Sequence, residues 1–120
     1  MRMTALLALL LATSAGAHWP APDEIVAEVA GAPGVVDARR DVTTPRLLLV
    51  RVGPSWAALS PARRVALADA WRTHWREAVP DGLVGVIDAA TARPAVNYDG
   101  HGRPRLAPPA PPPGTAATPP

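Results

Sequence analysis

Apolar residues recur at helical spacing between Ser60 and Val79, and this stretch has the clearest periodicity in the chain. At 100° per residue, one side of the predicted helix carries Leu67, Ala68, Trp71, Trp75, Ala78 and Val79. Ser60 can cap the first turn with its hydroxyl, Pro61 suits the first helical position, and Pro80 stops the helix. We therefore expect a helix over residues 60–79 whose two tryptophans need a large apolar surface to cover them.

A short helix followed by a hairpin is predicted before the long helix. Asp23 and Glu24 open the short helix, where acidic side chains suit the first turn, and Gly31 ends it. Residues 35–41 have no cleanly apolar face, which is typical of an edge strand. Residues 46–52 contain four consecutive apolar residues, which predicts a strand that is covered on both faces or nearly so.

Two more strands are predicted after the long helix. Residues 83–89 form the third strand, in which Gly85 indicates either a bulge or a close approach of the helix. Residues 95–99 form the fourth strand, with Val96 and Tyr98 on one face. We expect an α+β domain, a small two-layer sandwich of order α-β-β-α-β-β. Its mainly antiparallel four-stranded sheet carries the long helix on one face.

The order of these elements resembles that of the small periplasmic BON domains. The resemblance rests on the succession of helices and strands alone, and no residue is carried over from it. It implies a module that associates with membranes or with partner proteins.

The first seventeen residues have the pattern of an export signal. Met1 and Arg2 supply a positive start, residues 3–12 are almost wholly apolar, and residues 15–17 form an A-x-A cleavage pattern. The apolar run is shorter than the roughly 20 residues that span a bilayer. We expect cleavage after Ala17, no transmembrane segment in the mature chain, and a bacterial protein that is periplasmic or secreted.

Proline dominates the end of the chain, and a segment of this composition cannot build a core. Its prolines are Pro104, Pro108, Pro109, Pro111, Pro112, Pro113, Pro119 and Pro120. The predicted organisation is a signal peptide over 1–17, a short lead over 18–22, an α+β domain over 23–99, and a disordered Pro-rich tail over 100–120.

Composition excludes some kinds of site. The chain has no cysteine, so neither disulfides nor thiolate metal sites are available. All of its basic residues other than histidine are arginine, but the formal net charge is only +2. Because acidic residues are interleaved with the arginines, we do not expect nucleic-acid binding.

Histidines are the first candidates for chemistry. His18 would be the new N-terminal residue after cleavage, and its amine and imidazole together could chelate Cu(II) in the manner of the histidine-brace enzymes. Such a site needs a second histidine, for which His74 and His101 are the candidates. As a general base, His74 would need an orienting carboxylate, and the sequence does not place Asp88 or Asp99 beside it.

The other candidates have simpler explanations. Trp56 most simply plugs one end of the core, and its alternative role is a stacking platform for a ligand. Residues 99–102 read as a turn after the fourth strand rather than as a metal or phosphate contact. Ser14, Ser55 and Ser60 lack the context of a nucleophile elbow. The sequence therefore assigns no catalytic, cofactor-binding or metal-binding residue.

These observations favour an exported, small, non-catalytic binding or accessory module. Its partner is an unidentified protein or envelope component, and its oligomeric state is open. One alternative is a binder of acidic polymers that uses Arg39, Arg40, Arg46, Arg51, Arg63 and Arg64, which can cluster only if the first hairpin adjoins the start of the long helix. The other is a small copper protein that uses His18.

Overall fold

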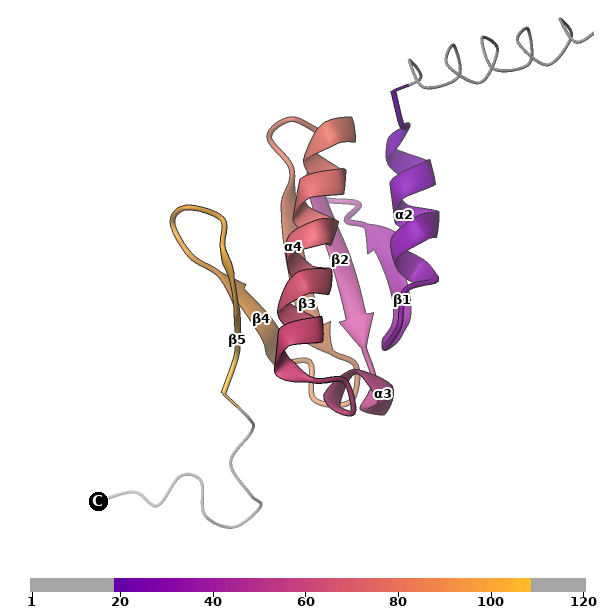
Figure 1. Ribbon diagram of the computed structural model, residues 1–120. Coiled ribbons are helices and arrows are strands. Elements are labelled where there is room, and N and C mark those ends of the chain that lie inside the picture. The colour runs from indigo at the N-terminus through magenta and orange to yellow at the C-terminus, as the bar shows by residue number, and fades with distance from the viewer. Residues whose placement is uncertain (1–18, 109–120) are drawn as a thin grey trace, which may run out of the picture.

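The computed structural model describes residues 19–108, which form helices and one mixed five-stranded sheet (Figure 1). The elements are α2 (Pro22–Ala30), β1 (Val35–Arg40), β2 (Leu47–Val52), α3 (Pro54–Ala57), α4 (Pro61–Ala78), β3 (Leu83–Asp88), β4 (Pro94–Tyr98) and β5 (Pro104–Leu106). The expected signal peptide, His18 and the residues beyond 108 lie outside the described part of the chain. None of the helices within residues 19–108 is long and apolar enough to cross a membrane.

Both longer helices begin as the sequence predicts. Ser60 is the N-cap of α4, where its Oγ accepts a hydrogen bond from the Arg63 backbone N–H at 3.2 Å, and Pro61 opens the helix. At the start of α2, the Glu24 carboxylate reaches back to accept the Ala21 N–H at 2.8 Å. Local sequence signals therefore set both helix starts, and α4 ends at Ala78, close to the expected boundary.

The strands lie in the order β1-β2-β3-β4-β5, and only the central pair β2–β3 is parallel. Parallel pairing follows from the long crossover through α3 and α4 that separates these two strands. The predicted edge position of β1 is confirmed.

The expectation of a four-stranded sheet is wrong in one respect, because part of the range assigned to the tail forms β5. Tyr98 pairs with Pro104, and Val96 pairs with Leu106. Proline is tolerated at the first residue of an edge strand, where its missing N–H disrupts no central ladder. The α+β class with helices on one face is correct.

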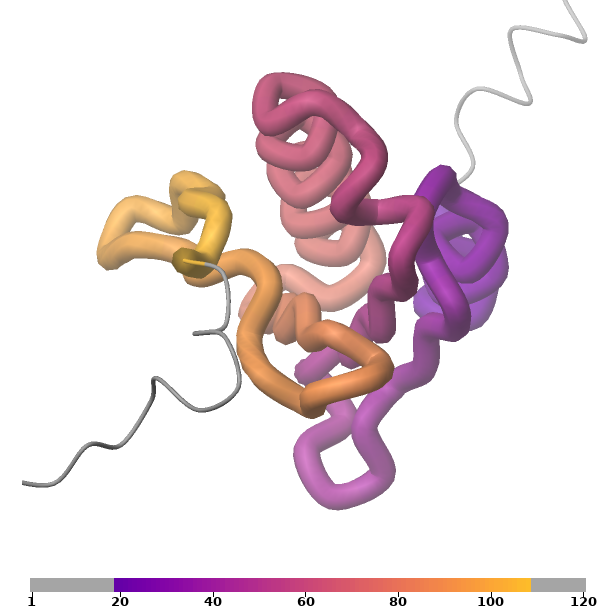
Figure 2. Tube along the Cα trace, turned by 90° about the horizontal axis from the view of Figure 1, so that it is seen from below, coloured from indigo at the N-terminus to yellow at the C-terminus, as the bar shows by residue number. Residues whose placement is uncertain are grey.

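The core lies between the sheet and the helix layer formed by α2 and α4. Figures 1 and 2 show these two helices side by side on one face of the sheet. Trp71 and Trp75 are 4% and 0% exposed, which confirms that this side of α4 covers the sheet. The other buried apolar residues are Ile25, Val29, Leu48, Val50, Val52, Trp56, Ala68, Val79, Val86 and Val96.

Within residues 19–108 no helix lies on the other face of the sheet, so β2, which the sequence predicts to be covered on both faces or nearly so, is fully covered on one face only. Burial alternates along β2: Leu48, Val50 and Val52 are buried, whereas Leu47 and Leu49 are only partly buried. Gly85 pairs with Leu49 and so faces away from α4, which rules out a close approach of the helix there. The bulge falls one position later in β3, between Val86 and Ile87.

Candidate functional site

The short helix α3 holds Trp56 at one end of the core. The Trp56 ring stacks on Trp71 of α4, with ring centroids 5.4 Å apart and an angle of 28° between the planes. Gly34 fixes the backbone on the other side. It has a φ of +82°, and a Cβ at this position would lie 2.8 Å from the Trp56 Cα. The predicted role of Trp56 as an end plug of the core agrees with its 4% exposure.

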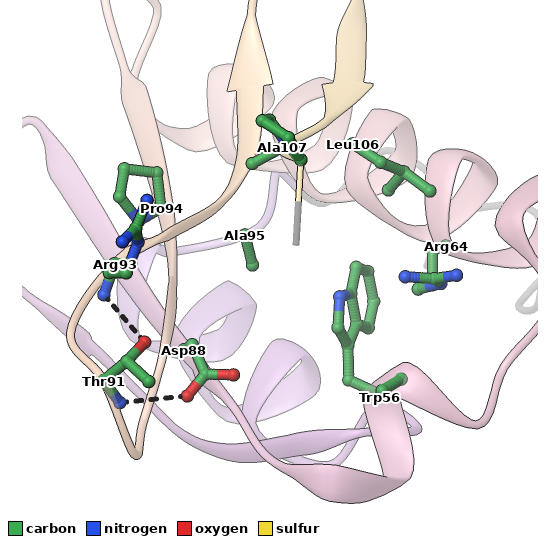
Figure 3. Close-up of a pocket in the computed structure, with 11 residues that line it drawn as sticks. Trp56, Arg64, Asp88, Thr91, Arg93, Pro94, Ala95, Leu106 and Ala107 are labelled. Atoms are coloured by element: carbon green, nitrogen blue, oxygen red, sulfur yellow. Dashed lines mark hydrogen bonds between the residues drawn. The ribbon is translucent and has the colours of Figure 1, made fainter. Parts of the chain in front are cut away.

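A cavity of about 620 Å³ opens beside Trp56, and we call it the Trp56 cavity. It is lined by Trp56, Ala57, Arg64, Asp88, Thr91, Arg93, Pro94, Ala95, Leu106, Ala107 and Pro108. Figure 3 shows Trp56 on one wall, Ala95 and Ala107 opposite, and the arginines Arg64 and Arg93 on opposite sides. Segments from α3, α4, the β3–β4 turn and β5 therefore build one hollow, although they are far apart in sequence.

Arg64 is the unusual group in this wall. Its Nε is shielded from solvent and has no hydrogen-bond acceptor among the described residues. Within residues 19–108, neither Arg64 nor Arg93 forms an ion pair with a carboxylate. A shielded guanidinium N–H without an acceptor is costly, because it has lost its hydration and gained no partner.

Asp88 ends β3 and shapes the turn into β4. Its Oδ1 accepts hydrogen bonds from the backbone N–H groups of Ala90 at 2.8 Å and Thr91 at 3.1 Å. The turn closes with Ala92 at a φ of +62°. In Figure 3 the second carboxylate oxygen of Asp88 points toward Trp56. Asp88 therefore has a structural role through one oxygen and presents the other to the cavity.

The uncovered face of the sheet is the second candidate surface, and we call it the open face. Pairing with β2 places Arg39 beside Leu49, and Leu49 beside Gly85. On the far side, Asn97 pairs with Arg105 of β5. Alternation along the strands then assigns Asp37, Arg39, Leu47, Leu49, Arg51, Leu83, Gly85, Ile87, Asn97 and Arg105 to this face. An aliphatic centre on β2 and β3 is thus flanked by arginines on β1 and β5.

Charge on the open face is not balanced. Arg51 forms an ion pair with Asp37 across the β1–β2 pair. Arg39 and Arg105 are exposed, and in the described chain neither has an ion-pair partner. Leu83 is 44% exposed in the aliphatic centre. The face therefore combines apolar surface with positive charge at both edges.

The six arginines named in the sequence analysis do not form one cluster. Arg40 lies over the Trp75 ring at 5.7 Å, and Arg46 is 4.0 Å from Asp81, so both mark the C-terminal end of α4. Arg63 and Arg64 lie in the first turn of the same helix, and its 18 residues span about 27 Å. The remaining pair, Arg39 and Arg51, belongs to the open face.

The histidines are also separated. His74 Nδ1 lies 2.8 Å from Glu28 Oε2, so α2 supplies a carboxylate that neither Asp88 nor Asp99 provides. The two side chains are 44% and 59% exposed, which is typical of a surface contact between helices. Within the described range, no three side chains from His, Asp and Glu gather as metal ligands. Because His18 lies outside that range, the copper hypothesis stays a prediction.

His101 lies in the turn between β4 and β5. Asp99 Oδ1 accepts the His101 N–H at 2.8 Å and the Arg103 N–H at 3.0 Å. These two backbone hydrogen bonds lower the pKa of the Asp99 carboxyl below its usual value, and the hydrogen bond from Arg103 has the larger effect. The run 99–102 is therefore a hairpin turn held by Asp99, in agreement with the simpler of the two sequence interpretations.

Sequence reasoning missed Arg93, Leu106 and the partner of His74. These positions come together only through tertiary contacts, and Glu28 is 46 residues from His74. Arg64 was named from the sequence only as one of six candidate arginines, and no local pattern shows that its Nε is shielded. The comparisons with family models, with curated proteins and with solved structures find no match to this chain.

Proposed function

We propose that this protein is an exported, non-catalytic binding module that docks a partner protein on the open face of its sheet. The observation that carries the proposal is the composition of that face. In a two-layer domain, the face of the sheet without helices is left open to a partner, and within residues 19–108 the centre of this face is aliphatic. An exposed apolar patch with a polar rim is typical of an interaction site.

Charge selects the kind of partner. Arg39 and Arg105 flank the aliphatic centre, so two copies stacked face to face would bring positive charge together. A protein segment with carboxylates beside aliphatic residues fits better, because its acidic groups meet the arginines at the rim. The arrangement of His74 and Glu28 does not favour catalysis, since the pair is exposed and no hydrogen bond links His74 to a hydroxyl in residues 19–108.

Site-specific photo-crosslinking in the native host tests this proposal. A photoreactive amino acid at Leu83 should form an adduct with a partner protein, whereas the same group at Ala27, exposed on α2, should not. Arg39→Glu should weaken the Leu83 adduct, and Arg63→Glu, exposed at the other end of the domain, should leave it unchanged. Equal adducts at positions 83 and 27, or an adduct with a second copy alone, would refute the proposal.

Binding of an acidic polymer is the less favoured candidate, because the arginines lie in separate places. A salt titration distinguishes the two. Charge-driven polymer binding weakens steeply with salt. Docking on an aliphatic centre should lose only the contribution of its rim charges.

The export part of the proposal has its own test. Mass spectrometry of the protein from the periplasm or medium should find His18 at the N-terminus, as the cleavage pattern predicts. An exported protein that retains Met1 would contradict the signal-peptide interpretation and the copper alternative together.

A further inference from the structure

We propose that the Trp56 cavity binds an organic carboxylate that carries an apolar group, and that Arg64 holds the carboxylate. This site is distinct from the open face. The inference does not depend on the partner proposed above, because a different set of residues carries it.

The cavity has the size and walls of a small-molecule site. Its volume of about 620 Å³ falls within the roughly 300–1,000 Å³ that is typical of ligand pockets. Trp56, Ala95 and Leu106 give it apolar walls (Figure 3). A small number of polar groups among such walls fixes the orientation of a ligand. The apolar group of the ligand would rest against these three side chains.

Arg64 selects an anion of a particular shape. The two Nη groups of the guanidinium present parallel N–H donors along one edge, and these donors match the two oxygens of a carboxylate. In this protein the Nε is shielded from solvent and therefore also from the cavity, so the two Nη groups of Arg64 are the donors that a ligand in the cavity can meet. A bound carboxylate would pair with these Nη groups and would neutralise the guanidinium charge, which has no carboxylate partner within residues 19–108.

The other charged groups of the wall favour a monoanion. Arg64 and Arg93 contribute two positive charges and Asp88 one negative charge, so the lining carries a net charge of +1. A dianion such as phosphate would meet stronger repulsion from Asp88 than a carboxylate does.

A peptide C-terminus and a free aliphatic acid both offer a carboxylate, and Asp88 can distinguish between these two kinds of ligand. Its oxygen that faces Trp56 can accept a hydrogen bond from a ligand N–H, because its turn hydrogen bonds use Oδ1. The C-terminus of a peptide offers a carboxylate together with such an N–H. A free aliphatic acid offers the carboxylate alone.

Three small molecules that carry the same branched aliphatic group test the proposal. Each is titrated against the protein while the indole N–H signals are followed by NMR. 4-Methylpentanoate has the carboxylate and the apolar group, N-acetyl-leucine adds the N–H, and N-acetyl-leucinamide lacks the charge. We expect the Trp56 signal, assigned with Trp56→Phe, to shift with a Kd of roughly 1 mM for an acid of this size. The amide should bind at least about tenfold more weakly. Tighter binding of N-acetyl-leucine than of 4-methylpentanoate would identify peptide C-termini as the source, and equal binding would identify free acids.

Arg64→Gln should raise the Kd of the better acid at least about tenfold. Arg63→Gln is the matched control, because Arg63 is the exposed neighbour outside the lining, and its Kd should not change. The comparison of acid with amide in the unaltered protein does not use Arg64→Gln, so the test survives a folding defect in that variant. Equal affinity for acid and amide, no shift of the Trp56 signal, or an unchanged Kd in a folded Arg64→Gln would each overturn the proposal.

Discussion

Truncation of Trp75 to alanine should come close to unfolding the domain. The Trp75 side chain is fully buried, its Nε1–H donates a hydrogen bond to the Arg46 carbonyl oxygen at 2.9 Å, and the Arg40 guanidinium lies over its ring. A Cβ at Gly82 would lie 2.5 Å from the ring, so the chain after α4 is also fitted to it. Removal of a buried tryptophan costs about 3–5 kcal/mol. A domain of this size has a total stability of roughly 4–12 kcal/mol.

Urea unfolding followed by circular dichroism measures this effect. Trp75→Phe keeps most of the apolar volume but removes the N–H donor, so it should cost about 1–2 kcal/mol and lower the midpoint by roughly 1 M. Trp19→Ala is the control, because Trp19 is 78% exposed and its loss should change stability by less than about 0.5 kcal/mol. The reasoning fails if Trp75→Ala unfolds at the same urea concentration as Trp19→Ala.

Two further predictions concern the β4–β5 hairpin. Gly102 has a φ of +79°, in the left-handed region that favours glycine, so Gly102→Ala should cost about 1–2 kcal/mol in urea unfolding. Gly100→Ala, which has no atom within 4 Å of the new Cβ, should not, and equal costs would contradict this. Burial raises the pKa of Tyr98, the single tyrosine, whose hydroxyl donates to the Ala68 carbonyl oxygen at 2.8 Å. Its contribution to stability is therefore complete below the ordinary pKa near 10 and is lost as pH rises above it. Absorbance at 295 nm should show no phenolate near pH 10 while circular dichroism shows a folded protein, and early phenolate in a folded protein would be the contrary result.

Local signals account for the part of the fold that the sequence predicts well. The cap at Ser60, the proline at position 61 and the spacing of the tryptophans act within a few residues of one another, and α4 begins and ends close to the predicted positions. The predicted strands also agree with β1 to β4 to within about one residue. These patterns carry their own information about period and boundary.

The rest depends on contacts that no local pattern records. The run Leu47–Val50 has the composition of a strand covered twice, but whether a second layer exists depends on where the helices pack. Likewise β5 is too short and too rich in proline to be recognised, and it forms because β4 offers an edge to pair with. The Trp56 cavity draws on four separate segments, so its shape could not be inferred before the topology was known.

The parallel pairing of β2 with β3 constrains the order in which the chain can fold. Hairpins such as β1–β2 close over short turns, whereas β2 and β3 can meet only after the segment that contains α4 has crossed the sheet. An isolated hairpin is marginal in water, so the central pair must join the two hairpins before either becomes durable. We therefore expect the slowest step of folding to be the docking of α4 with the closure of this pair. Amide hydrogen exchange should then be slowest in β2 and β3, whose opening requires the whole domain to unfold.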